Sequence, residues 1–116
     1  MVATGVHHVS INVTDVPAAV EFYGALGFTP FDRPDFGFDG AWLRLAGGGE
    51  LHLLGFPPPD AKGQHFALRV DDMDAALADL ATRGIEPTRT GEIEGICRQA
   101  FLADPSGNEV ELNQPF

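Results

Sequence analysis

Four side chains of this sequence are suited to metal coordination and recur in a regular pattern. They are three histidines and one glutamate: His8, His52, His65 and Glu111. Each lies in a stretch where apolar and polar residues alternate, which indicates a half-buried β-strand, and each lies on the polar face of its strand. Three imidazoles and one carboxylate form a donor set that suits Zn, Ni, Fe(II), Mn or Co.

Two of the histidines are adjacent, in the stretch GVHHVSINVT at residues 5–14. Neighbouring residues of a strand point to opposite faces, so at most one of the two can belong to a given site. His7 shares the face of the apolar Val9, whereas His8 shares the polar face with Ser10 and Asn12. We therefore expect His8, and not His7, to be the ligand.

The sequence contains an internal repeat. HVSINVTDVPAAVEFYGALGFTP (8–30) aligns without a gap with HFALRVDDMDAALADLATRGIEP (65–87), and AWLRLAGGGELHL (41–53) aligns with AFLADPSGNEVEL (100–112). His8 is thereby equivalent to His65, and His52 to Glu111. If two modules are related by a pseudo-two-fold axis, equivalent positions converge about that axis, which predicts a single metal site.

Each module is expected to contain a strand, a helix and three further strands. Asp15 and Asp72 are suited to cap the helix N-termini, and Gly27 and Gly84 to end the helices. The later strands are predicted near 28–33, 41–46 and 49–56, and near 88–93, 97–103 and 108–114. The apolar faces of the helices are predicted from helical spacing to be Val16, Ala19, Val20 and Tyr23, and Met73, Ala76, Leu77 and Leu80. A Pro- and Gly-rich connector separates module one (1–58) from module two (63–116) within one domain, 1–116.

The composition excludes several classes of partner. With 17 acidic and 7 basic residues the net charge is −10, which argues against nucleic acid and anionic membranes. No apolar run approaches the ~18 residues of a membrane span, and the N-terminus lacks the features of a signal peptide. The lone Cys97 suits a reducing compartment. These features predict a cytoplasmic, acidic, single-domain protein.

The stretches HHVSINVTD, VEFYGALGF, ELHLLGFP, HFALRVDD and DPSGNEVEL resemble the vicinal oxygen chelate superfamily, which includes glyoxalase I, bleomycin-resistance proteins and extradiol dioxygenases. The resemblance implies an α+β fold in which two tandem βαβββ modules form a U-shaped, partly open mixed β-barrel with helices outside. It also implies a divalent metal held by His8, His52, His65 and Glu111, and a homodimer.

The resemblance implies a glyoxalase-type lyase or isomerase, which binds a substrate's vicinal oxygens to the metal. Glu111 would then be both ligand and general base, and the expected substrate-binding residues are Ser10, Asn12, Arg69 and Asn113. Glyoxalase I usually carries a glutamate where His52 stands and an arginine near Asn12, so this sequence departs from it at both places.

Two alternatives stay open. An extradiol-type ring-cleaving dioxygenase would use His8, His65 and Glu111 as a two-histidine, one-carboxylate triad, with His52 at a position that the triad leaves open. A protein that sequesters an antibiotic or metabolite without turnover would share the fold, although such proteins generally lack the metal residues.

Overall fold

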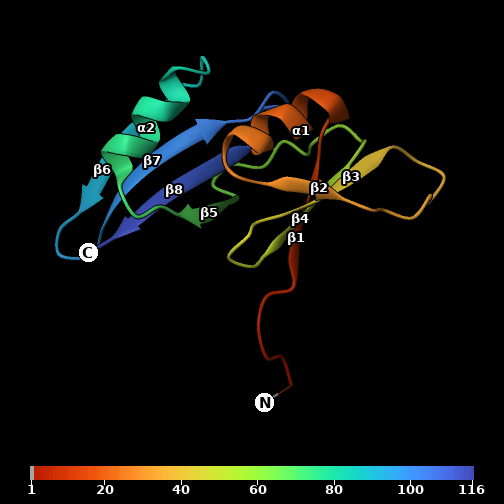
Figure 1. The fold of residues 1–116 in the computed structure, drawn as a ribbon, viewed down its shortest axis with the longest axis horizontal. Helices are drawn as coiled ribbons and strands as arrows, with labels where there is room; N and C mark the ends of the chain where they lie inside the picture. The colour runs from red at the N-terminus through yellow and green to blue at the C-terminus, as the bar shows by residue number, and fades with distance from the viewer. Residues whose placement is uncertain (1) are drawn as a thin grey trace. The chain divides into compact units, whose positions relative to one another are not determined.

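The computed structural model describes residues 2–116, and the chain divides into two compact units, residues 1–59 and 60–116. The first unit comprises β1 (His8–Asn12), α1 (Val16–Ala25), β2 (Thr29–Phe31), β3 (Gly40–Arg44) and β4 (Glu50–Leu54). The second comprises β5 (His65–Arg69), α2 (Met73–Ala81), β6 (Arg89–Ile93), β7 (Cys97–Ala103) and β8 (Glu109–Pro115). Both units therefore have the predicted βαβββ order (Figure 1).

The two sheets have the same topology. Strand order is β1-β4-β3-β2 in the first unit and β5-β8-β7-β6 in the second. The first and last strands of each unit pair in parallel, and the remaining neighbours pair antiparallel. An α+β fold with two mixed four-stranded sheets is thus confirmed, and the repeat seen in the sequence is a repeat of structure.

The core of the first unit lies between α1 and the strands β3 and β4. Val16, Ala19 and Tyr23 of the helix are buried as predicted, but Val20 is only half-buried and Phe22 is buried instead. The buried stripe is therefore rotated toward Phe22, whose ring packs edge-on against Tyr23 at 5.0 Å.

The core of the second unit lies between α2 and the strands β7 and β8. Met73 and Leu80 are buried, while Ala76 and Leu77 at the edge of the predicted face are half-buried. Cys97 at the start of β7 is also buried and is 3% exposed. Neither helix of residues 2–116 is long and apolar enough to cross a membrane.

Both helices begin at the aspartates predicted to cap them. The Asp15 carboxylate accepts a hydrogen bond from the Ala18 N–H, and the Asp72 carboxylate accepts one from the Ala75 N–H, each at 3.0 Å. After each helix the chain turns through a glycine of positive φ, Gly27 at 111° and Gly84 at 75°. The caps fix where each helix starts, and hence where the preceding strand, which carries His8 or His65, must end.

Candidate metal and substrate site

In the second unit, two of the predicted ligands lie side by side. His65 Nε2 is 3.0 Å from Glu111 Oε1. Both residues lie on the sheet face opposite the buried Val110 and Leu112, as the alternation in β8 predicted. Glu111 is nevertheless 5% exposed, so its carboxylate is removed from bulk water and depends on its protein partners.

The partners of His65 determine how its ring is protonated. Nδ1 is 2.9 Å from the carbonyl oxygen of Gly63, and a carbonyl can only accept, so Nδ1 carries a proton. Nε2 then faces a carboxylate oxygen, which also accepts. The gap between Nε2 and Glu111 Oε1 is therefore suited either to a second proton on the imidazole or to a cation shared by the two atoms.

The second oxygen of Glu111 is held by two amides. Oε2 accepts hydrogen bonds from Gln99 Nε2 at 3.2 Å and from Asn113 Nδ2 at 2.8 Å. Burial acts to raise the pKa of Glu111, but the hydrogen bonds from Asn113, Gln99 and His65 outweigh it and the pKa is lowered. Glu111 is therefore ionised at neutral pH, with Oε2 fixed and Oε1 directed at His65.

The pKa of His65 is shifted the other way. Its hydrogen bond to the Gly63 carbonyl raises the pKa of the imidazole above 6.5, burial opposes this, and Glu111 and Glu109 add to the rise. A metal ion would have to displace the proton from Nε2. The same arrangement that orients the ring therefore makes proton and metal compete for one atom.

One aromatic ring and one ion pair border the His65–Glu111 pair. Phe101 packs edge-on against the His65 ring with centroids 5.7 Å apart. The guanidinium of Arg89 lies 3.8 Å from the centroid of the Phe101 ring, and its Nη2 is 3.0 Å from Glu109 Oε1. The polar face of the second sheet thus carries charge of both signs.

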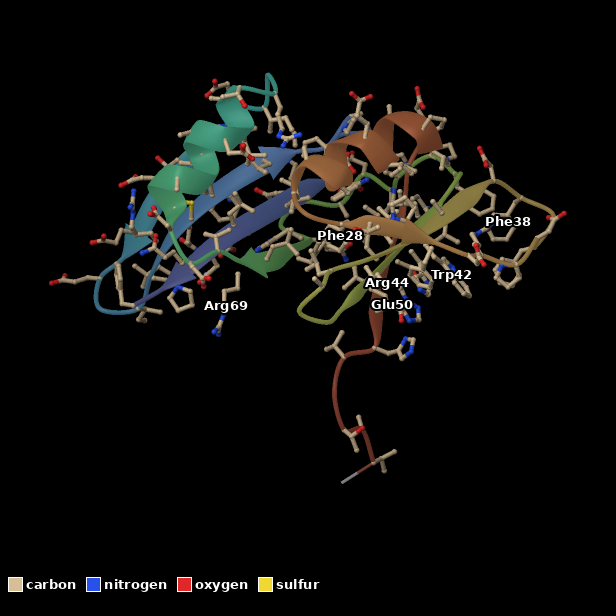
Figure 2. The ribbon with its side chains drawn as sticks, in the orientation of Figure 1. Phe28, Phe38, Trp42, Arg44, Glu50 and Arg69 are labelled. Carbon is tan, nitrogen blue, oxygen red and sulfur yellow. The ribbon has the colours of Figure 1, made fainter. Side chains whose placement is uncertain are left out.

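In the first unit, the two predicted ligands form part of a ring stack. His52 is stacked between His8, at a centroid distance of 3.9 Å, and Trp42, at 4.6 Å, with interplanar angles of 16° in both cases. His52 Nε2 is 3.0 Å from Glu50 Oε1, and this hydrogen bond lowers the pKa of Glu50. Figure 2 shows Trp42 and Glu50 on the side of the sheet that faces away from α1.

This stack bears on whether His8 and His52 fit a shared metal ion. The lone pair of an imidazole nitrogen lies in the plane of its ring, so the lone pairs of two nearly parallel rings do not meet at one point. His8 Nδ1 is 2.9 Å from His7 Nδ1, which leaves Nε2 as the second nitrogen of His8. His8 and His52 therefore do not fit a shared metal ion in this arrangement, and His52 would first have to rotate out of the stack.

The remaining predicted site residues differ in their surroundings. Asn12 Nδ2 donates to the carbonyl of Pro57 at 3.3 Å, and the Asn113 amide is engaged by Glu111. Ser10 is exposed on β1, opposite His52 in the strand register. Arg69 is exposed and points away from α2 (Figure 2). Asn12 and Asn113 therefore hold neighbouring groups in position, whereas Ser10 and Arg69, the other two predicted substrate-binding residues, have exposed side chains.

Sequence reasoning missed three contributors to the site: Gln99, the Gly63 carbonyl and Glu50. A signal for Gln99 exists in the strand register, because Gln99 is opposite Asn113 and shares its face. Within residues 2–116 no group of three or more His, Cys, Asp or Glu side chains is arranged to hold a metal ion. Each unit brings two of the predicted ligands together, and the four-ligand centre stays a prediction.

Comparison with known proteins identifies the family. The pattern of the Glyoxalase/Bleomycin resistance protein/Dioxygenase superfamily matches residues 5–112. The chain is 31% identical to the uncharacterized protein YaeR of Escherichia coli, covering 92% of this chain and 93% of YaeR. It is 32% identical to the uncharacterized protein YwkD of Bacillus subtilis, covering 97% and 98%. The chain therefore belongs to this superfamily, as its motifs indicated.

A solved structure adds one functional comparison. TnmS3, an antibiotic-binding protein from Streptomyces sp. CB03234, is 32% identical to the chain. It superimposes with a TM-score of 0.83 and covers 100% of this chain and 99% of TnmS3. The chain is thus similar over its whole length to a protein that is described by what it binds.

Proposed function

We propose that this protein is a divalent-metal-dependent lyase or isomerase of the glyoxalase type, acting on a small substrate with vicinal oxygens. The observation that carries the proposal is the His65–Glu111 pair. Nε2 and Oε1 face each other at 3.0 Å, while the other polar atom of each residue is bound to the protein. Such outer hydrogen bonds are what orients ligand atoms toward a metal ion.

The proposed ligands are the four predicted ones: His65 and Glu111 would hold the ion, with His8 and His52 as the other two. When bound, the ion supplies a Lewis acid for the substrate's two oxygens. Glu111 would also be the general base for a proton on the carbon next to a carbonyl, since its carboxylate is ionised at neutral pH and its hydrogen bonds from Gln99 and Asn113 hold it in position. Phe101, 8% exposed, excludes water from one side of His65.

The proposal is tested by metal content and affinity. Protein purified without an affinity tag should bind one Zn, Ni, Co, Mn or Fe(II) ion per chain. His65→Gln and Glu111→Gln should each weaken binding by at least about 100-fold, because each removes a ligand rather than an outer partner. Glu94→Gln is the matched control, since Glu94 is exposed and has no contact with the proposed ligands, and it should bind as wild type. A wild-type protein that binds none of these ions after reconstitution would contradict the proposal.

The bound metal then directs the activity assays. If the bound ion is Zn, Ni, Co or Mn, the reactions to assay are isomerisation of α-ketoaldehyde adducts and epimerisation. If the bound ion is Fe(II), the assay is oxygen uptake with catechols as substrates, which tests the alternative function of a ring-cleaving dioxygenase.

A second candidate function is sequestration of a planar ligand, as part of a homodimer or a monomer. It is favoured by the stack of Trp42, His52 and His8, which would present flat ring faces to an aromatic molecule. The similarity to the antibiotic-binding TnmS3 over the whole chain points the same way. Tight binding of an aromatic ligand that persists after metal removal, without turnover, would support this function over the enzymatic one.

A further inference from the structure

Arg89 lies on the same face of the second sheet as Glu111. In the strand register Arg89 is opposite Phe101, and Phe101 is opposite Glu111. Side chains directly opposite each other on neighbouring strands point to the same face. Arg89 therefore stands in one row with the carboxylate of the proposed metal pair, separated from it by a single aromatic residue.

Two contacts hold the guanidinium of Arg89 in place. Its central carbon is 3.8 Å from the centroid of the Phe101 ring, and Nη2 is 3.0 Å from Glu109 Oε1. The cation–π contact fixes the guanidinium plane without occupying its N–H donors, which point outward from the edge of the group. The position of the charge is thus set by Phe101, which also contacts His65.

Glu109 satisfies Arg89 only in part. One contact joins the pair, although a guanidinium offers a fork that matches both oxygens of a carboxylate. The Arg89 side chain is 61% exposed, so an anion from solution can reach it. A pair this open to water is weak, and a competing carboxylate can replace Glu109.

The other arginines of the second unit are placed differently. Arg83 and Arg98 pair with Asp79 and Asp74 of α2, on the far face of the sheet. Arg69 shares the face of His65 but has no ion pair within the described residues 2–116. Arg89 is therefore the cation that is both on this face and held in position.

We propose that Arg89 binds a carboxylate of the substrate, displacing Glu109, while the substrate's vicinal oxygens would be held by the metal ion proposed at His65 and Glu111. This inference rests on the proposed function and defines its substrate class as a small anionic molecule. One end of that molecule carries two adjacent oxygens and the other end a carboxylate. Phe101 lies between the two anchoring points and packs against the part that joins them.

The test uses the zinc-loaded full chain and calorimetry. Catechol is the neutral probe with vicinal oxygens, and protocatechuate, homoprotocatechuate and dihydrocaffeate add a carboxylate at increasing distance. At least one acid should bind about tenfold more tightly than catechol, because it gains a bidentate pair with Arg89. Arg89→Met should remove this preference, and the matched control Arg83→Met should keep it. Glu109→Gln should strengthen acid binding several-fold, since it removes the competing carboxylate.

The outcomes separate this inference from the proposed function. Catechol binding without any acid preference, or with a preference that survives in Arg89→Met, overturns the inference and leaves the proposed function standing. If the preference for the acids over catechol is lost in Arg69→Met but kept in Arg89→Met, the inference is overturned, and Arg69 is the residue that binds the carboxylate. Failure of the zinc-loaded protein to bind catechol or any of the acids overturns both.

Discussion

His65 and Glu111 have pKa shifts of opposite sign that stabilise the same charged pair. The raised pKa of His65, due first to the Gly63 carbonyl, keeps the imidazole protonated to higher pH. Glu111, despite its burial, is kept ionised to lower pH by Asn113, Gln99 and His65. In the metal-free protein the two groups therefore form an ion pair below the folded pKa of His65, and this pair is the competitor that a metal ion must replace.

The pair predicts a pH dependence of stability. His65, with its raised pKa, contributes fully below its unfolded value near 6.5, and this contribution is lost as pH rises through the folded pKa. Glu111, with its lowered pKa, contributes above its unfolded value near 4.5 and loses this as pH falls through the folded pKa. The contribution should be greatest between these values, and below about 1 kcal/mol because His65 is partly exposed.

The measurement is the urea midpoint of metal-free wild type and of His65→Gln from acid to neutral pH. The difference between the two proteins should peak inside this window and shrink above it. A difference that stays constant with pH would show that the pair contributes nothing.

At this scale the sequence predicts which residues face the site but not how their atoms are engaged. His8, His52, His65 and Glu111 were placed on polar faces by alternation alone. The role of Gln99 depends on the pairing of β7 with β8, and that of Gly63 on the path of the connector, neither of which periodicity encodes. The stacking of His52 on Trp42 and His8 is a choice of rotamer, which strand alternation leaves open.

At the scale of the elements, each helix depends on one aspartate for its start. Asp15→Ala and Asp72→Ala should each lower the free energy of unfolding by about 1 kcal/mol, because each leaves the first turn without its side-chain acceptor. Asp71→Ala is the control, since Asp71 is exposed and lies outside the cap. Urea denaturation checks the values, and equal losses in Asp71→Ala and Asp72→Ala would contradict the prediction.

Two glycines of the first unit should respond to alanine with opposite signs. A Cβ at Gly40 would collide with the backbone oxygen of Leu53 and lie 2.8 Å from Arg33 Nη2, so Gly40→Ala should cost about 1–3 kcal/mol. Gly24 lies within α1 with nothing within 4 Å of a Cβ, so Gly24→Ala should stabilise by about 0.5–1 kcal/mol. Thermal or urea unfolding of both variants tests this, and a stable Gly40→Ala would refute the close approach.

The elements themselves were largely predictable because the repeat provides two independent views of one pattern. Asp15 with Asp72 and Gly27 with Gly84 mark the same boundaries twice, and strands β2 to β4 and β6 to β8 begin within one residue of the predicted starts. The exception is the buried stripe of α1, where Phe22 replaces Val20. Helical spacing admits both positions, and the packing of β3 and β4 against the helix decides between them.

At the scale of the whole molecule, the net charge of −10 opposes folding through self-repulsion. Raising NaCl from about 0.01 M to about 0.15 M shortens the screening length to about 8 Å, so the urea midpoint should rise. The effect should vanish near pH 4.5, where the net charge approaches zero. A midpoint that falls with salt at neutral pH would mean that attractive ion pairs, such as Arg98 with Asp74, outweigh the repulsion.

The first unit contains the single tryptophan of the chain and the second its single cysteine. Trp42 is stacked on His52, so its fluorescence responds when the first sheet loosens. Cys97, 3% exposed in β7, becomes reactive toward thiol reagents only when the second sheet opens. The unaltered protein thus carries one optical and one chemical reporter. The order in which its two units unfold can therefore be observed without introducing a label.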